Sequence, residues 1–292
     1  MIVDGHHHIW RRADLPWLSG PVVPRIFGPY EPIRRDYPCE EYLADATPHG
    51  VTGSVYVQAN WAPARGLDEA LWVHGEHERT GWPTAQVAFA DLSGETIAGD
   101  LEALAGIPTV RGVRQQLHWH EQELYRFAFR PDVMNDAAWR RGFALLEEHW
   151  LLFELQVFSS QFEDAASLAA AFPNTTLVLM HCGMPEDLSE AGVTAWREGM
   201  KLLAERPNMH VKLSGLGTFI RTNEPAHVAR IVRETVALFG AERCLYGSNF
   251  PIEKLWCSYG ELIGAYRSAA SVYSADDQRK LLHDTAKRLY RL

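Results

Sequence analysis

The sequence of 292 residues predicts an α/β fold of the (β/α)8 class, the TIM barrel. Short apolar runs rich in β-branched residues alternate with longer helical patterns from one end of the chain to the other. About eight of each are present, and eight βα units are what a closed parallel barrel needs. The alternative, an open doubly wound sheet, requires a GxGxxG turn after an early strand, and the sequence lacks that motif.

The strands are expected, in chain order, at residues 2–8, 53–59, 84–90, 110–117, 152–158, 176–181, 210–214 and 244–248. The helices are expected at residues 67–79, 137–149, 162–171, 196–205, 226–239, 259–271 and 276–290. Because no linker, low-complexity tract or larger repeat divides these units, the sequence predicts a single domain that spans residues 1–292.

Two connections, residues 11–38 and 119–136, are long and rich in aromatic residues. Loops of this length in a compact domain usually act as lids or binding loops. The chain contains ten Trp, ten Tyr and twelve Phe, and those in the loops would line a pocket rather than fill a core. These features favour a cyclic or planar small molecule as the substrate.

Charge and cysteine usage narrow the class of partner. The net charge is −9 and no Lys/Arg cluster occurs, so we expect a small-molecule partner and neither nucleic acid nor a membrane surface. The four cysteines are scattered, which is typical of reduced thiols in the cytoplasm. We find no secretion signal and no apolar run of about 20 residues, which agrees with a cytoplasmic protein. A homo-oligomer is compatible with this composition.

The first predicted strand carries the most informative residues. Side chains alternate between the two faces of a strand, so Asp4, His6 and His8 are expected on one face and His7 on the other. If the shared face is the barrel interior, His6 and His8 lie at its open end, where they can bind a divalent metal or flank a substrate. A single buried structural histidine with an exposed neighbouring pair is the alternative interpretation.

Histidines and an arginine also end or interrupt other predicted strands. His181 ends the sixth strand, and a second strand that delivers a histidine to the same rim favours a shared catalytic site. Arg114 and His118 have matching parity on the fourth strand, and an Arg suits a carboxylate or another oxyanion. A surface ion pair is the alternative for Arg114. Cys182 is expected to be a small buried residue rather than a nucleophile.

Further polar residues are candidates for substrate contacts. Gln58 near the end of the second strand, Trp119 in the second long loop and Gln156 on the fifth strand are expected to bind the substrate. Glu154 and Lys212 also lie on otherwise apolar strands, where buried polar groups need partners. These two residues either serve the site or only neutralise each other.

Together, the segments DGHHHIW, FELQVF, LMHCGMP, VKLSGLG and YGSNFP resemble one branch of the amidohydrolase superfamily. This branch includes pyrone-dicarboxylate lactonase and the sugar-acid lactonases for fuconolactone and rhamnonolactone. The resemblance spans nearly the whole chain, and its most specific elements are the opening Asp4-x-His6-x-His8 and the closing GSNFP. It implies hydrolysis of a cyclic ester, with His6, His8 and His181 polarising the carbonyl, either with a divalent metal such as Zn²⁺ on these histidines or without one.

The sequence departs from this family at Asn249. The family usually ends the eighth strand with an Asp that activates the hydrolytic water, whereas an Asn forms hydrogen bonds but cannot act as a general base. One hypothesis is that His118, His181 or Glu154 takes the proton while Asn249 orients the water. A second is that the missing carboxylate weakens metal binding, so that the site works without metal or catalyses another reaction on a lactone or acyl substrate.

Three functions follow from these observations. The first is a lactonase in which the histidines act on the carbonyl, Arg114 holds a substrate carboxylate and loop aromatics cover the ring. The second is a metal-dependent decarboxylase of aromatic or unsaturated acids, because a related branch of the superfamily carries similar histidines. The third is a small-molecule-binding barrel without catalytic activity.

Overall fold

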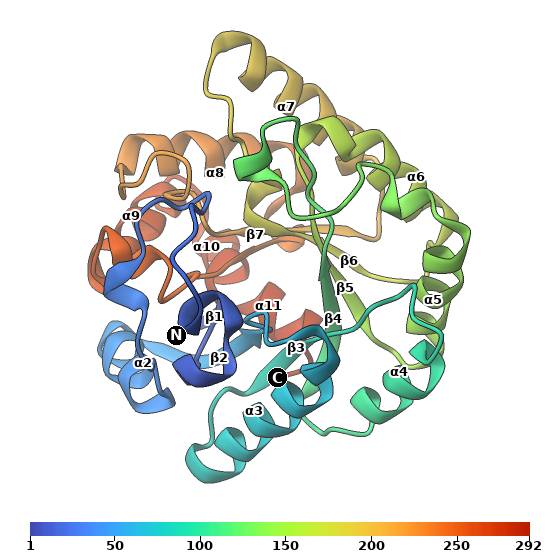
Figure 1. The fold of residues 1–292 in the computed structure, drawn as a ribbon. Helices are drawn as coiled ribbons and strands as arrows, with labels where there is room; N and C mark the ends of the chain where they lie inside the picture. Colours follow the sequence, from blue (N-terminus) through green and yellow to red (C-terminus); the bar gives the residue numbers. More distant parts are fainter.

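The eight predicted strands form one parallel barrel. The computed structural model describes residues 1–292, apart from the side chain of Pro63. The strands follow one another around the barrel in chain order, as Figure 1 shows. Their bounds are β1 (Ile2–His7), β2 (Val51–Val57), β3 (Ala85–Phe89), β4 (Val110–Gln116), β5 (Leu152–Gln156), β6 (Leu177–Leu179), β7 (Met209–Leu213) and β8 (Cys244–Tyr246).

Backbone hydrogen bonds beyond the end of β8 join the last strand to the first. The Asn249 N–H donates to the His6 carbonyl at 2.7 Å, and the His8 N–H donates to the Phe250 carbonyl at 2.7 Å. The predicted (β/α)8 barrel is therefore confirmed, and its closure depends on the two segments that carry His6, His8 and Asn249.

The helices lie around the barrel and over its ends: α2 to α9 surround the strands, and α11 lies at the centre of the ring (Figure 1). Their bounds are α1 (Pro16–Ser19), α2 (Cys39–Ala46), α3 (Gly66–Thr80), α4 (Ile97–Ala105), α5 (Ala137–Glu148), α6 (Phe162–Ala171), α7 (Glu190–Ala204), α8 (Pro225–Phe239), α9 (Tyr259–Ala270), α10 (Ala275–Arg279) and α11 (Thr285–Leu289). The sequence patterns did not predict α2 and α4. They also placed the start of α7 at Trp196, although the helix begins at Glu190, where Ser189 caps it by accepting from the Gly192 N–H.

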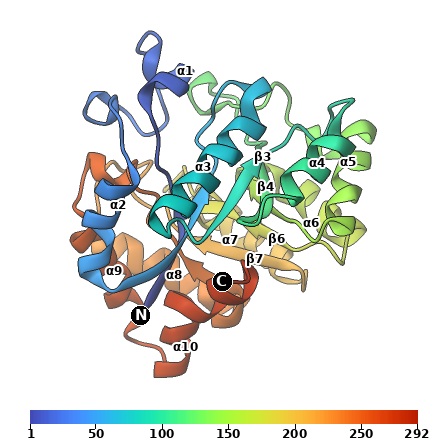
Figure 2. The same ribbon diagram turned by 90° about the horizontal axis from the view of Figure 1, so that it is seen from below.

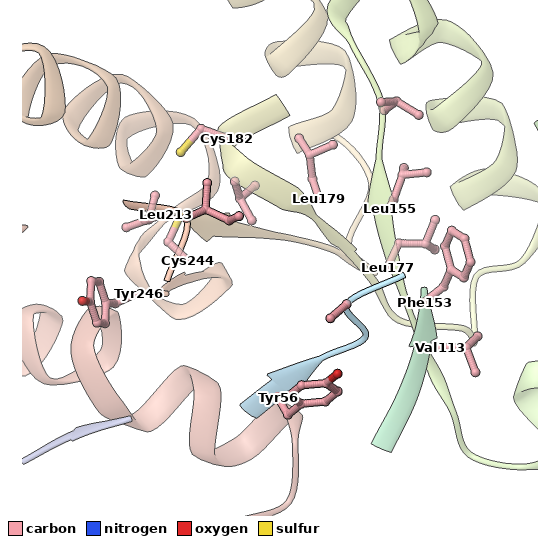
Figure 3. Packing of buried hydrophobic residues seen from close by; sticks show 14 of the residues in the cluster. Tyr56, Val113, Phe153, Leu155, Leu177, Leu179, Cys182, Leu213, Cys244 and Tyr246 are labelled. Carbon is pink, nitrogen blue, oxygen red and sulfur yellow. The ribbon is translucent and has the colours of Figure 1, made fainter. Parts of the chain in front are cut away.

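Two apolar layers hold the barrel together. Inside it, small and branched side chains such as Val3, Val55 and Val87 pack against Tyr290 of the C-terminal segment. Outside it, larger side chains pack between strands and helices, and Figure 3 shows part of this layer. Phe153 on β5 belongs to the outer layer, with its ring centroid 5.3 Å from that of Phe143 on α5. Because strand side chains alternate, the neighbouring even-numbered residues of β5 face inward.

The strand β1 does not keep the regular alternation that the sequence suggests. Its pairing with β2 shifts register between Asp4 and His7. Asp4 Oδ2 accepts hydrogen bonds from the hydroxyls of Tyr42 on α2 and Tyr259 on α9, both at 3.0 Å. The ring of His7 also stacks on Tyr42, with centroids 3.7 Å apart. The prediction that Asp4 shares a face with His6 and His8 is therefore wrong, because the irregular register turns Asp4 toward the helices.

The two ends of the barrel differ. Segments around α1 rise above one end, whereas both termini and α10 lie at the other (Figure 2). The long connections 11–38 and 119–136 contain only α1 and short 3₁₀ turns among their described residues, as expected for loops over an open barrel end. Each helix in the described part of the chain is too short or too polar to cross a membrane.

Candidate active site

A cavity of about 1240 Å³ opens at the carboxyl ends of the strands, which is where TIM-barrel enzymes carry their active sites. Both long loops contribute to its walls. We call its buried or half-buried polar residues the floor: His8, Arg114, His118, Gln156, His181 and Asn249. We call four exposed apolar residues at its mouth the rim: Val23, Leu124, Phe127 and Phe129.

The predicted pair His6 and His8 forms a chain of imidazoles. His6 is fully buried beneath the floor, and its Nε2 lies 3.3 Å from Nε2 of His8. His8 Nδ1 lies 2.7 Å from the Val57 carbonyl oxygen, which can only accept a hydrogen bond. Neutral His8 therefore carries its proton on Nδ1, and its Nε2 is an acceptor. Without a bound metal, this acceptor takes the Nε2–H of His6.

His181 occupies a strained turn directly after β6. Its φ of 53° and the φ of 51° at Cys182 both lie in the left-handed region, which is unusual for two successive residues other than glycine. The turn aims the ring of His181 at His6, with centroids 4.9 Å apart. Its Nδ1 lies 2.8 Å from Ser214 Oγ. Gly215 makes room, since a Cβ at that position would lie 2.5 Å from His181 Nδ1.

The electrostatic surroundings keep these histidines neutral. Burial lowers the pKa of His8 to about 3, and the positive charge of Arg114 adds to this effect. The same two causes lower the pKa of His118 to about 3. Burial also holds the pKa values of His6 and His181 well below the ordinary value, assisted by Lys212 and Arg114. At physiological pH these imidazoles are therefore neutral and keep a lone pair that can accept a hydrogen bond from water, although the lowered pKa makes each a weaker base than a free imidazole.

Arg114 is the one cation on the floor. Only 3% of it is exposed, and burial lowers its pKa to about 10. It donates to Gln156 Oε1 at 3.3 Å and to the backbone carbonyl of Gln58, while its Nε lacks a partner among the described residues. The surface ion pair is therefore the wrong interpretation, because the side chain is buried and its hydrogen bonds go to amide oxygens. A buried guanidinium without a carboxylate partner is suited to bind an anion.

A second buried cation lies below the floor and is paired. Lys212 Nζ lies 2.6 Å from Glu154 Oε1, and both side chains are completely buried. The Tyr290 hydroxyl donates to the same carboxylate oxygen at 2.6 Å. The interpretation that Glu154 and Lys212 neutralise each other is confirmed. Because Glu154 is not one of the residues that line the cavity, it is not in position to act as the general base.

Asn249 follows β8 in the left-handed conformation, with a φ of 56°. Its Nδ2 lies 3.5 Å from Oε1 of Glu253. The other carboxylate oxygen of Glu253, Oε2, accepts a hydrogen bond from Trp256 Nε1 at 2.7 Å. Glu253 is 1% exposed, and burial raises its pKa to about 7. Glu253 is not among the site residues that the sequence predicts. The signal that could have found it is an acidic residue four positions after Asn249, in the 3₁₀ turn Glu253–Leu255.

The remaining predicted contacts divide into two groups. Gln156 reaches the cavity, where its Oε1 accepts from Gln116 Nε2 at 3.1 Å as well as from Arg114. Gln58 lies behind the lining, and its Oε1 accepts from the Asn60 N–H at 2.7 Å. Trp119 also lies outside the lining, so neither Gln58 nor Trp119 contacts the cavity directly. Its indole ring stacks under Arg126, 5.0 Å from the guanidinium carbon.

Cys182 fits the expected role of a buried thiol. The side chain is completely buried, and burial raises its pKa to about 12. The sulfur lies in the apolar layer between strands and helices (Figure 3). A thiol in this environment is protonated at physiological pH and is a poor nucleophile.

The donor set fits a divalent metal only in part. Two nitrogen ligands of a tetrahedral Zn²⁺, each about 2.0–2.1 Å from the metal, lie about 3.3 Å apart, and His6 Nε2 and His8 Nε2 have this separation. A metal site needs more ligands than two. No group of three His, Cys, Asp or Glu side chains among the described residues is arranged to hold a metal ion. Asn249, whose side chain lies next to His8, offers an amide rather than a carboxylate.

Comparison with known proteins agrees with this architecture. The family model described as "Amidohydrolase" matches residues 3–292, so the chain belongs to the amidohydrolase family. It is 32% identical over 293 residues to the uncharacterized protein y4mH of Sinorhizobium fredii, covering 100% of this chain and 98% of that protein. It is 28% identical over 303 residues to an L-fucono-1,5-lactonase of Burkholderia multivorans, covering 99% and 96% of the two chains.

A solved structure shows the same similarity in three dimensions. It is the crystal structure of an amidohydrolase from Burkholderia multivorans with bound zinc, which is 27% identical to this chain and has a TM-score of 0.84. The match covers 100% of this chain and 99% of that one. The family match and these relatives define an enzyme of the amidohydrolase superfamily, with lactonase-type hydrolases among its relatives.

Proposed function

We propose that this protein is a lactonase that hydrolyses a cyclic carboxylic ester bearing a carboxylate. The observation that carries the proposal is Arg114, a buried guanidinium on the cavity floor whose hydrogen bonds include no carboxylate among the described residues. An incoming carboxylate would supply the missing anion beside the neutral imidazoles of His8 and His181. The lactonase named among the relatives supports the same class of reaction.

In the proposed reaction, water attacks the lactone carbonyl carbon. His181 is the preferred general base, because it lines the cavity and its Nδ1 is held by Ser214. When Nδ1–H donates to Ser214 Oγ, Nε2 presents a lone pair to the water. The water oxygen forms the new bond to carbon, the ring C–O bond breaks, and the proton on His181 passes to the leaving ring oxygen. The product is an open-chain hydroxy acid.

Asn249 and Glu253 have supporting roles in this proposal. An ionised Glu253 carboxylate only accepts hydrogen bonds, so it favours the orientation in which Asn249 Nδ2 points at it. The Oδ1 atom of Asn249 then faces the cavity and can accept a hydrogen bond from the attacking water. Asn249 thus orients the water, while a histidine takes the proton.

A divalent metal is not needed for these steps. When bound, such a metal would polarise the carbonyl as a Lewis acid, and His6 and His8 are the residues that would hold it. Because the donor set is incomplete, each of these steps uses only the protein's own side chains and water.

The test is to incubate the purified protein with a panel of lactones and to measure the acid that is released at constant pH. The panel contains L-fucono-1,5-lactone, a pyrone dicarboxylate and five-membered lactones that carry a carboxylate. We expect acid release from at least one carboxylated lactone, strongly reduced in His181→Gln and unchanged in the control His149→Gln, whose side chain lies outside the cavity.

Release of carbon dioxide from an aromatic acid, without acid release from any lactone, would identify a decarboxylase instead. Binding without any turnover would indicate a barrel that only binds its ligand.

A further inference from the structure

The cavity changes in character from its floor to its mouth. Buried polar atoms without a hydrogen-bond partner gather around the floor, including Nε of Arg114, Oε1 of Gln116 and Nδ1 of His118. Such atoms are costly unless a ligand or water satisfies them. Among the described residues that line the upper walls, two more such atoms occur, Nε of Arg25 and Nε1 of Trp61. Arg25 already stacks on the ring of Trp17, with 5.7 Å between its guanidinium carbon and the ring centroid.

The walls and the rim above this floor are mainly apolar. From the loop 11–38 come Trp17 and Phe27, whose ring centroids lie 6.1 Å apart. On another wall lie Tyr125 and Phe219, with centroids 5.6 Å apart. The rim continues this surface to the solvent, and its Phe129 is 82% exposed. Exposed large apolar side chains that line a cavity mark a binding surface.

The volume of the cavity, and the fact that the floor and the rim line the same cavity, indicate what kind of ligand it holds. The floor and the rim line one cavity of about 1240 Å³, which is larger than the roughly 300–1,000 Å³ of most small-molecule sites. A single ligand can therefore contact both regions at once. A sugar lactone is small and carries a hydroxyl on nearly every carbon. The walls offer such groups a few partners, such as Asn60, Asp91 and Glu123, but most of the lining residues above the floor are apolar. An apolar substituent would fit the walls and the rim instead.

We propose that the substrate is an amphipathic lactone, with its lactone ring and carboxylate on the floor and an apolar substituent of about five or more carbons against the walls and the rim. This inference rests on the proposed lactonase function and names its substrate class. It distinguishes this cavity from one that serves polyhydroxylated sugar lactones.

The experiment measures kcat/KM along a homologous series. The substrates are five-membered lactones with one carboxylate and an alkyl chain of one to seven carbons, with L-fucono-1,5-lactone as the polar comparison. Burial of one methylene is worth about 0.8 kcal/mol, so we expect kcat/KM to rise about three- to fourfold for each added carbon until the rim is reached. A flat series, or a higher kcat/KM for the sugar lactone, overturns the inference and leaves the lactonase function intact.

A variant tests whether the rise of kcat/KM with chain length depends on the rim. We expect the double substitution Leu124→Ser and Phe129→Ser to lower the ratio of kcat/KM between the longest and shortest chains by about tenfold. The matched control is Val272→Ser, which removes an exposed apolar side chain outside the cavity and should leave the ratio unchanged. An unchanged ratio in the double variant, or an equal fall in the control, contradicts the assignment.

A binding measurement separates this inference from the catalytic proposal. The open-chain hydroxy acids of the same series are the products of the proposed reaction, so they are not hydrolysed further. Their Kd values are measured by calorimetry. We expect Kd to fall about three- to fourfold per methylene in wild-type protein, even if no lactone is opened. Chain-independent Kd values overturn the amphipathic ligand, whereas chain-dependent Kd values without hydrolysis overturn only the lactonase function.

Discussion

Two buried cations of the barrel interior, Lys212 and Arg114, have opposite surroundings. Lys212 lies below the cavity and forms an ion pair of 2.6 Å with Glu154, which Tyr290 also contacts. Arg114 lies on the cavity floor, and its hydrogen bonds go to Gln156 and to the Gln58 backbone rather than to a carboxylate. Burial of a charge is expensive unless a partner compensates it. The paired cation is explained by the fold, whereas the unpaired one calls for a ligand.

The largest expected effect concerns the paired cation. Lys212→Met leaves Glu154 buried without its counter-charge, so we expect the free energy of unfolding to fall by about 3–5 kcal/mol. Denaturant titration measures this loss. The control is the double variant Lys212→Met and Glu154→Leu, which removes both charges and should recover most of the stability. A single variant as stable as wild type would mean that the pair does not compensate its burial.

For the unpaired cation we expect the reverse pattern. Arg114→Met removes a buried charge that has no hydrogen-bonded counter-ion and is compensated only from a distance by Glu154 and Glu69, so the melting temperature should stay the same or rise. Activity should suffer, because a hydrogen bond to a charged group is worth about 1.5–3 kcal/mol, and kcat/KM on a carboxylated lactone should drop about hundredfold. Steady-state kinetics and thermal unfolding check both expectations. A destabilised variant with intact kcat/KM would make Arg114 a structural residue like Lys212.

A third prediction concerns the pH dependence that Glu253 introduces. Burial raises its pKa to about 7, while His8 and His118, with pKa values of about 3, stay neutral above pH 5. The groups against Glu253 are Asn249, Trp256 and the backbone at Gly217, which lower its pKa, and the phenols of Tyr246 and Tyr266 and the Cys257 thiol. We expect kcat to rise about tenfold between pH 6 and pH 8 as the carboxylate ionises.

Variants identify the group responsible for this pH dependence. In Glu253→Gln the rise in kcat should disappear, whereas the exposed control Glu78→Gln should keep it. Trp256→Phe removes a donor that stabilises the carboxylate, so the midpoint should move to higher pH. The pH dependence of stability runs opposite to that of kcat. Because the pKa of Glu253 is raised from 4.5 to about 7 in the folded protein, the free energy of unfolding of wild type falls as pH rises from about 4.5 to about 7. The stability of Glu253→Gln relative to wild type should therefore increase across this window. An unchanged pH profile in both variants contradicts this role.

The smallest expected effect is that of metal removal. Since the described donors do not form a three-ligand site, dialysis against a chelator should change kcat/KM by less than about twofold. Elemental analysis of the dialysed protein provides the control that metal has been removed. A loss of activity that added Zn²⁺ restores would show that ligands rearrange around the pair His6 and His8.

The sequence predicted the barrel well because its signals are local. Alternating β-rich runs and helical patterns identified all eight strands, and for β5 they also identified the inward-facing side chains Glu154 and Gln156. The prediction failed at Asp4, where a register shift in β1 breaks the regular alternation of side chains between the two faces of the strand. Short helices such as α2 were missed because a helix of eight residues has little periodicity to detect.

For the site, the sequence named several residues that lie together, but it could not give their contacts. His8, Arg114, His118, Gln156, His181 and Asn249 do line one cavity. The sequence could not tell that Arg114 lacks a carboxylate partner while Lys212 has one, because both answers depend on contacts between distant strands. Glu253 was missed for the same reason, since its raised pKa comes from burial and not from its neighbours in the chain.

The central claim is that Arg114 binds the substrate carboxylate. The most direct test is a double-mutant-type cycle that combines two forms of the protein with two forms of the substrate. The kcat/KM values of wild type and Arg114→Met are compared on a carboxylated lactone and on its neutral carboxamide. If Arg114 binds the substrate carboxylate, the substitution should cost about hundredfold on the acid and less than about threefold on the amide. Equal losses on both substrates would contradict the account, because Arg114 would then not bind the carboxylate.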